Sequence, residues 1–162
     1  MLRTFGLFLL TLSLAAAAVT PGLAAPHAGD AAAAFTLPKA AGGDLTSASL
    51  RGKPTYLNFF ASWCGPCNEE APSVASLYAK YRSKGLAIVG VDEQEDKSKA
   101  LDFAHKYKWP FTVAIDDGEM GKNYGAFALP VHIFIDKHGK ISTYRLGEMN
   151  PGEIEDAIKK II

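Results

Sequence analysis

Two cysteines, Cys64 and Cys67, lie three positions apart and are the only cysteines of the 162-residue chain. Such a pair can close into a disulfide and open again, which is a two-electron redox reaction. A disulfide that closes so short a loop adds little stability, so the spacing favours a reactive pair over a structural cross-link. The alternative is half of a zinc site, but the sequence has no second cysteine pair and its four histidines lack the spacing of paired ligands.

The residues around the pair predict that a helix begins at the cysteines. Cys64 is expected at the N-cap, with Gly65 as the first helical residue and Pro66 as the second. Because Pro66 has no N–H, the backbone N–H of Cys67 is the expected donor to the Cys64 sulfur, and the helix dipole adds positive potential there. Both effects favour the thiolate, so we expect a lowered pKa at an exposed, nucleophilic Cys64. Cys67, one turn further on, is expected to be buried and to resolve the mixed disulfide.

Buried strands and amphipathic helices alternate along the chain, which predicts an α/β fold with a mixed sheet flanked by helices. Residues 31–52 precede them as an irregular, hairpin-rich lead-in, and the lysines and acids of residues 92–99 are expected to form a solvated helix start. Asn150, Pro151 and Glu153 predict a capped start for the last helix. The expected strands cover residues 55–60, 86–91, 111–115, 131–135 and 141–146, and the other expected helices cover residues 67–84, 96–108 and 119–124.

The first residues of the chain have the pattern of an export signal. Arg3 is followed by an apolar stretch over residues 5–19 and then by small residues. This order predicts a signal peptide over residues 1–24, with an uncleaved anchor in the inner membrane as the alternative. In both cases a single domain over residues 25–162 is expected outside the cytoplasm, in the periplasm or an equivalent compartment.

The charges of the chain are balanced, with 17 lysines and arginines against 17 aspartates and glutamates. This balance gives no reason to expect a nucleic acid or an anionic membrane surface as a partner. We expect a monomer with neither a cofactor nor a bound metal ion.

Several motifs connect the cysteine pair to a known family. Residues 58–67 read Asn-Phe-Phe-Ala-Ser-Trp-Cys-Gly-Pro-Cys and are followed by Glu70, while residues 89–92 and 124–136 add a Val-Gly-Val-Asp motif and a Leu-Pro-apolar motif. With these motifs the chain resembles, over about residues 33–162, the TlpA/ResA branch of exported thiol-disulfide oxidoreductases. The resemblance implies a thioredoxin fold with an N-terminal extension and the helical insertion of that branch.

The resemblance also implies which residues meet a substrate. Pro130 would follow a cis peptide bond and face the Cys64 sulfur, and a trans proline opening a strand is the alternative. The backbone of Leu129 would pair with an extended substrate segment. Trp63 would cover the disulfide as an apolar platform, beside Gly65 and Pro66 as further substrate contacts, and ordinary packing is the alternative role for Trp63.

One position departs from cytosolic thioredoxins. These usually carry a buried acid where this chain has Asn58, so the proton of Cys67 needs another partner. Glu70, one turn beyond Cys67 on the same helix, is the candidate, and a solvated helix acid is the alternative. His132 stands two residues after Pro130, where it could tune the site or meet a metal-bound substrate, although a packed core histidine is favoured.

The sequence therefore predicts an exported oxidoreductase that reduces disulfides of substrate proteins through Cys64 and Cys67. The resemblance suggests apocytochrome c or the cysteines of a copper site as substrates, and a membrane electron donor that regenerates the reduced pair. The alternative is a copper-binding chaperone that uses the same cysteines with His132. A peroxidase of the peroxiredoxin type is disfavoured, because Ala61-Ser62-Trp63 stands where such enzymes carry threonine and proline before the reactive cysteine.

Overall fold

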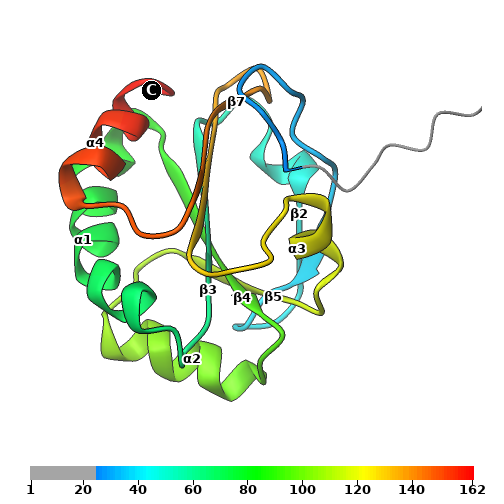
Figure 1. Ribbon diagram of the computed structural model, residues 1–162, viewed down its shortest axis with the longest axis vertical. Coiled ribbons are helices and arrows are strands. Elements are labelled where there is room, and N and C mark those ends of the chain that lie inside the picture. Colours follow the sequence, from blue (N-terminus) through cyan, green and yellow to red (C-terminus); the bar gives the residue numbers. More distant parts are fainter. Residues whose placement is uncertain (1–24) are drawn as a thin grey trace, which may run out of the picture.

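The structure is a computed structural model that describes residues 25–162 (Figure 1). The predicted signal peptide or anchor over residues 1–24 lies outside the described residues. In the described part of the chain, no helix combines the length and the apolar character that crossing a membrane requires.

A five-stranded mixed sheet forms the centre of the molecule, with the strand order β5-β4-β3-β6-β7. The strands β3, β4 and β5 are parallel, whereas β6 runs antiparallel to β3 and β7 antiparallel to β6. The predicted mixed sheet is therefore confirmed, and β3 occupies its middle. The bounds are β3 Thr55–Phe60, β4 Ala87–Glu93, β5 Thr112–Asp116, β6 Val131–Ile135 and β7 Ile141–Leu146.

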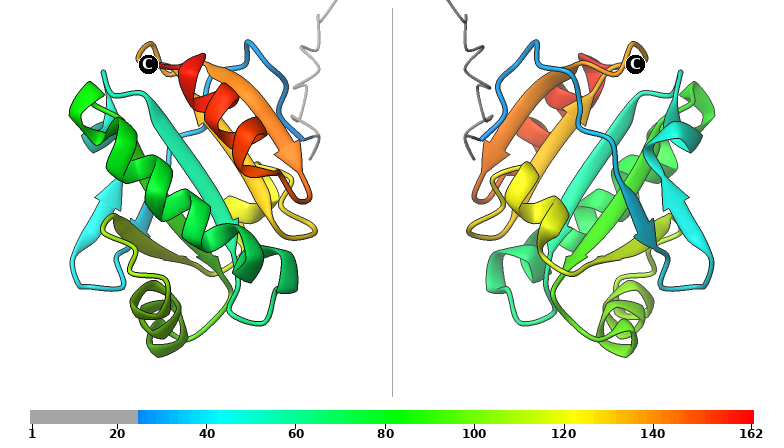
Figure 2. Two further views of the ribbon diagram at one scale, coloured as in Figure 1. Left: turned by 90° about the vertical axis from the view of Figure 1, so that its left-hand side faces the viewer. Right: turned by 90° about the vertical axis from the view of Figure 1, so that its right-hand side faces the viewer.

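Helices cover one face of this sheet and a mixed layer covers the other (Figures 1 and 2). The helices α1 (Gly65–Tyr81) and α4 (Pro151–Lys159) lie side by side on the first face. The short α3 (Glu119–Asn123) lies on the opposite face, together with the hairpin of β1 (Thr36–Pro38) and β2 (Asp44–Thr46). The predicted hairpin lead-in is thus confirmed. Three further segments are α2 (Lys97–Lys106), η1 (Ser47–Leu50) and η2 (Arg82–Lys84).

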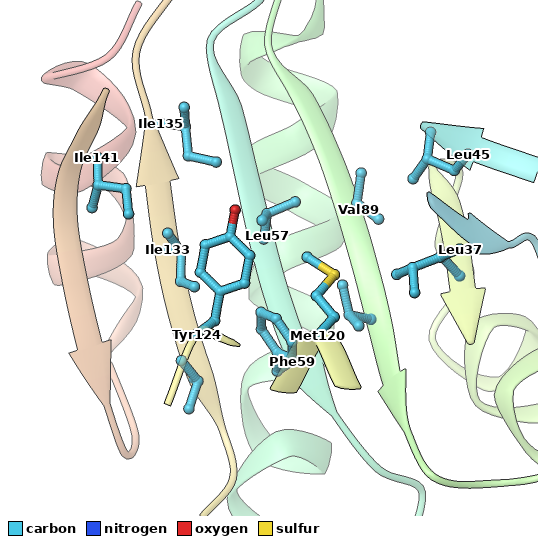
Figure 3. Close-up of a cluster of buried hydrophobic side chains, with 13 residues drawn as sticks. Leu37, Leu45, Leu57, Phe59, Val89, Met120, Tyr124, Ile133, Ile135 and Ile141 are labelled. Atoms are coloured by element: carbon cyan, nitrogen blue, oxygen red, sulfur yellow. The ribbon is translucent and has the colours of Figure 1, made fainter. Parts of the chain in front are cut away.

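The central strand is buried on both faces, as its apolar run predicts, because its side chains alternate between two cores. Leu57 and Phe59 pack under Met120 and Tyr124 of the α3 segment (Figure 3). Tyr56 belongs to the other core, which lies beneath α1 and α4. Because β3 is packed into both cores and α1 begins a few residues after its end, the strand holds the start of α1 in place relative to the layers on both faces of the sheet.

The predicted elements are all present, and their ends agree with the structure within three residues. The first helix begins at Gly65, as the predicted N-cap at Cys64 requires, and the last turn expected for this helix is the separate η2. The solvated helix start expected over residues 92–99 is wrong at its beginning, because Asp92 and Glu93 are buried in β4. They continue the strand because they pair with Ile115 and Asp116 of β5.

Gly90 of β4 is expected to be intolerant of even a methyl group. A Cβ atom at Gly90 would lie 2.5 Å from Trp109 Cζ3 and 3.2 Å from Phe60 Cε1, inside a packed aromatic cluster. Gly90→Ala is therefore expected to lower the free energy of unfolding by about 1–3 kcal/mol, measured by chemical denaturation. Gly65→Ala is the matched control for stability, because nothing lies within 4 Å of its Cβ position. Equal midpoints for the two variants would contradict the packing argument.

Candidate active site

The cysteine pair lies at the junction of β3 and α1. Cys64 is the N-cap of α1 and forms a disulfide with Cys67, with 5.3 Å between their Cα atoms. The backbone N–H of Cys67 donates to Cys64 Sγ at 3.3 Å, while Gly65 and Pro66 form the first helical positions. The predicted N-cap geometry is thus confirmed. This geometry directs a backbone donor and the positive end of the helix dipole to the Cys64 sulfur.

The expected difference in exposure between the two cysteines is wrong for this disulfide form. Cys64 and Cys67 are each 4% exposed. Both belong to a buried cluster with Phe60 and Ala61, and Leu129 packs against this cluster. The two cysteines therefore differ in their position at the start of α1, where Cys64 is the N-cap, and not in their exposure.

Two large aromatic side chains are exposed in the segments that precede Cys64 and Leu129. Trp63, which precedes Cys64, is 71% exposed, so the alternative that it is an ordinary packing residue is wrong. Phe127, in the loop that leads to Leu129, is 68% exposed. The sequence analysis missed Phe127, because nothing in its local pattern distinguishes an exposed aromatic residue from a buried one.

The peptide bond between Leu129 and Pro130 is cis, so the alternative of a trans proline is wrong. Pro130 is buried and its carbonyl accepts a hydrogen bond from the N–H of Gly147 at 2.8 Å. Leu129 is half-buried against the cluster that contains both cysteines. Its N–H and C=O make no hydrogen bond to another backbone group between residues 25 and 162. The backbone of Leu129 is therefore free to pair with an extended segment beside the disulfide.

Two polar residues that the sequence analysis missed hold the turn before Cys64. The carboxylate of Glu95 accepts hydrogen bonds from the N–H and the hydroxyl of Ser62, the latter at 2.7 Å. The side-chain amide of Asn68 donates to the carbonyls of Ser62 at 3.0 Å and of Cys64 at 2.7 Å. The amide oxygen of Asn68 accepts from the hydroxyl of Tyr107 at 2.7 Å, which ties this turn to the end of α2. The contacts of Glu95 with Ser62 and of Asn68 with Tyr107 join segments 33 and 39 positions apart, so no local sequence signal indicates them.

A chain of buried polar groups runs behind the pair, from α1 into the sheet. Glu70 is 5% exposed, so the alternative of a solvated helix acid is wrong. Its Oε1 accepts from the N–H of Met149, and its Oε2 lies 3.4 Å from Nε2 of the fully buried His132. His132 Nδ1 lies 2.7 Å from the hydroxyl of Tyr56. The oxygen of that hydroxyl accepts a hydrogen bond from the Asn58 amide at 3.0 Å. Burial, and secondarily the charge of Glu70, raises the pKa of Tyr56, which therefore stays a neutral hydroxyl.

A second buried acid, Asp92, lies at the end of β4 between Phe60 of β3 and Ile115 of β5. Neither of its carboxyl oxygens has a hydrogen-bond partner in the described chain. Burial, with a further contribution from the charge of Glu95, raises the pKa of Asp92 to about 7. Asp92 therefore carries a proton over most of the acidic range.

Asp92 is expected to make the protein less stable as the pH rises. Its pKa of about 7 in the folded state exceeds the value of about 3.9 in an unfolded chain. Its stabilising contribution is thus complete below about pH 4 and is lost as the pH rises through about 7. Asp92→Asn is expected to remove about 1–3 kcal/mol of the decrease in unfolding free energy between pH 5 and pH 8, measured by chemical denaturation.

Asp96→Asn provides the control for this prediction. Asp96 is the exposed N-cap of α2 and its side chain makes no capping hydrogen bond. This variant is expected to keep the pH dependence of the parent protein. A decrease in stability that is equally steep with and without Asp92 would contradict the assignment.

The sheet order, the cysteine pair at the start of α1 and the cis-proline before β6 together define the thioredoxin fold. The predicted helical insertion is α2, which connects β4 to the edge strand β5, and the β1–β2 hairpin is the N-terminal extension. The fold class predicted from the sequence is therefore confirmed.

Comparison with known proteins agrees with this class. A family model described as the AhpC/TSA family matches residues 28–144. The chain is 40% identical over 113 residues to the thiol-disulfide oxidoreductase ResA of Bacillus thuringiensis. The aligned residues make up 69% of this chain but only 65% of that relative. The chain is 32% identical over 136 residues to ResA of Halalkalibacterium halodurans, covering 83% of this chain and 77% of the relative. The chain therefore belongs to the AhpC/TSA family and groups with the ResA thiol-disulfide oxidoreductases.

A solved structure supports the same grouping. A secreted disulfide oxidoreductase of Mycobacterium tuberculosis, described as homologous to E. coli DsbE, is 29% identical to this chain with a TM-score of 0.71. The match covers 78% of this chain and 95% of that structure. The likeness therefore extends over nearly the whole of the solved domain.

Proposed function

We propose that the protein is an exported thiol-disulfide oxidoreductase that reduces disulfides of substrate proteins through Cys64 and Cys67. The observation that carries this proposal is the position of Cys64 at the N-cap of α1, where its sulfur accepts the N–H of Cys67. An N-terminal helix end favours the thiolate of a cysteine, and the thiolate is the attacking species in disulfide exchange. The names of the ResA relatives support the same activity.

The reaction follows from the arrangement of the two sulfurs. The Cys64 thiolate attacks the substrate disulfide, so a bond forms between Cys64 Sγ and one substrate sulfur while the other substrate sulfur leaves and takes a proton. Cys67 then loses its proton, attacks Cys64 Sγ and releases the second substrate thiol as the Cys64–Cys67 disulfide closes. Two electrons and two protons pass to the substrate. Glu70, three residues after Cys67 on α1, accepts the Cys67 proton in the second step.

The surface around the pair fits an extended protein segment. The free backbone of Leu129 pairs with this segment in the manner of an added strand, with Pro130 facing the Cys64 sulfur. Trp63, Gly65 and Pro66 are exposed next to the cysteines and form the rim of the site. A protein substrate with an accessible disulfide therefore suits this site better than a small thiol.

The direction of transfer and the location of the protein belong to the same proposal. The Gly65-Pro66 dipeptide is that of thioredoxin, which favours reduction of the substrate, and a membrane electron donor then restores the reduced pair. The apolar segment within residues 1–24 supports export, with the active domain over residues 25–162 outside the cytoplasm as a monomer. Apocytochrome c or the cysteines of a copper site are the substrates that this grouping suggests.

The copper-binding alternative is less well supported. It requires a nitrogen of His132 as a third ligand beside the two cysteines. Nδ1 of His132 faces the hydroxyl of Tyr56 and Nε2 faces Glu70, so neither nitrogen is free to join the sulfurs. Between residues 25 and 162, no group of three histidine, cysteine, aspartate or glutamate side chains is placed to hold a metal ion.

A direct exchange experiment tests the proposed function. The reduced full chain is mixed with an oxidised protein substrate such as insulin, the reaction is quenched with acid, and the remaining thiols are labelled and counted. The expected result is that two substrate thiols appear for each Cys64–Cys67 disulfide that forms. If the pair stays reduced while insulin keeps its disulfides, the proposed direction is wrong.

A further inference from the structure

The buried pair of Glu70 and His132 contains two polar atoms that lack a hydrogen-bond partner in the described chain. Glu70 Oε2 and His132 Nε2 lie 3.4 Å apart, and neither makes a hydrogen bond to any other group in the described chain. Glu70 is 5% exposed and His132 is not exposed at all. A buried polar atom without a hydrogen-bond partner costs free energy, so a role of the two side chains should account for the close approach of Glu70 and His132.

The surrounding hydrogen bonds assign the proton on the His132 ring. The amide of Asn58 donates to the hydroxyl oxygen of Tyr56 at 3.0 Å, which leaves the Tyr56 proton free to be donated to His132 Nδ1 at 2.7 Å. The same Asn58 amide nitrogen also lies 3.3 Å from Nδ1. Two donors converge on Nδ1, so Nδ1 accepts and the ring hydrogen sits on Nε2. The Nε2–H of a neutral imidazole then lies on the side of the ring that approaches Glu70, where Nε2 is 3.4 Å from Oε2 without forming a hydrogen bond in this disulfide form.

His132 and the loop before α4 together fix both oxygens of Glu70. Met149 donates its backbone N–H to Oε1, and His132 approaches Oε2 from β6. The backbone hydrogen bond orients the carboxyl group, and the approach of His132 places a polar neighbour at its second oxygen. Glu70 also lies on α1 three residues after Cys67, a spacing that places the two side chains on one face of the helix.

We propose that His132 is a positioning residue for the closing step of the disulfide: its Nε2–H holds the orientation of the Glu70 carboxyl group during this step, so that Glu70 can take the proton of Cys67. This inference rests on the proposed function. In this step the S–H bond of Cys67 breaks and the proton moves to the Glu70 carboxylate. The Cys67 thiolate forms a bond with Cys64 Sγ, the bond between Cys64 and the substrate sulfur breaks, and the substrate thiolate takes a proton from water. Glu70 afterwards returns its proton to the solvent.

Other ionisable groups near the pair are few. Cys67 on α1 is the proton donor, and Tyr56 on β3 is a neutral hydroxyl because its pKa is raised. Arg145 is the register partner of His132 on β7, but its side chain is exposed. From the loop before α4, the contact with Glu70 is a backbone N–H and carries no charge. His132 is thus the nearest side-chain donor to the Glu70 carboxylate.

The test separates the two steps with a small disulfide. The reduced full chain is mixed with 5,5′-dithiobis(2-nitrobenzoate) in a stopped-flow instrument over pH 5–9. The first coloured thiolate reports attack by Cys64, and the second reports closure by Cys67, whose rate does not depend on the reagent concentration. Because no protein substrate is needed, the result stands even if the protein fails to reduce insulin, so the two proposals fail separately.

His132→Leu is expected to slow the closing step about tenfold at pH 7, while the first step is unchanged. His132→Gln keeps an N–H donor and is expected to recover most of the rate. Glu70→Gln is expected to slow the closing step at least as much as His132→Leu does, and adding His132→Leu to it should change nothing further. Near-UV circular dichroism checks the fold of each variant.

Three results would overturn the inference. The first is a His132→Leu closing profile that matches the parent profile. The second is an equal loss in His132→Gln and His132→Leu, which would indicate a packing role for the ring. The third is a His132→Leu effect that multiplies the effect of Glu70→Gln, because His132 would then act independently of Glu70.

Discussion

Cys64→Ser is expected to abolish disulfide exchange, with the rate of insulin reduction falling by about 10³-fold or more. A serine hydroxyl stays protonated at neutral pH, so the N–H of Cys67 and the end of α1 have no thiolate to stabilise. Cys67 has no such helix-end donor and lies one turn deeper in α1. The measurement is the turbidity of precipitating insulin chains with dithiothreitol as electron source.

Glu69→Gln is the matched control for that loss. Glu69 is an exposed acid next to Glu70 on α1 and takes part in none of the contacts that surround the cysteines. Its replacement is expected to leave the rate within about twofold of the parent, because an exposed carboxylate has little influence on a partly buried site. A Cys64→Ser variant that retains a tenth or more of the activity would show that Cys67 attacks substrates by itself.

Cys67→Ser is expected to trap substrates instead of releasing them. Cys64 still attacks the substrate disulfide, but no second sulfur follows to break the bond between Cys64 and the substrate. A covalent complex should therefore accumulate on a non-reducing gel after acid quench and disappear with dithiothreitol. Mass spectrometry should place the substrate cysteine on Cys64.

The double variant Cys64→Ser/Cys67→Ser controls the trapping experiment. It keeps the exposed side chains of Trp63 and Phe127 but lacks both sulfurs. If complexes persist in this variant, they arise from contacts other than thiol exchange, and the assignment of Cys64 as the attacking residue fails. Loss of trapping in the double variant supports a covalent complex through Cys64.

The parts of the site that could be predicted from the sequence depend on local physical rules. Gly65 and Pro66 after Cys64 follow the rules of helix starts, so the N-cap position and the Cys67 donor could be predicted. The same kind of rule placed the capping box of α4, where Asn150 and Glu153 exchange hydrogen bonds as expected. Apolar runs likewise located β6 and β7 at their observed bounds.

The parts that could not be predicted depend on contacts between distant segments. Glu95 reaches Ser62 across 33 positions, and Glu70 meets His132 from another element altogether. The burial of Asp92 follows from pairing with β5, while a charged residue in sequence is more often solvated. The burial of Cys64 arises in the same way, because Leu129 packs against its cluster from the cis-proline loop.

The midpoint potential of the Cys64–Cys67 couple tests the central proposal most directly. It is obtained by equilibrating the full chain with dithiothreitol or glutathione buffers of known ratio and counting the remaining thiols. A protein that reduces substrates should give a value near or below that of thioredoxin, about −270 mV. A value near that of DsbA, about −120 mV, would make the protein an oxidant of its substrates and would contradict the proposed function.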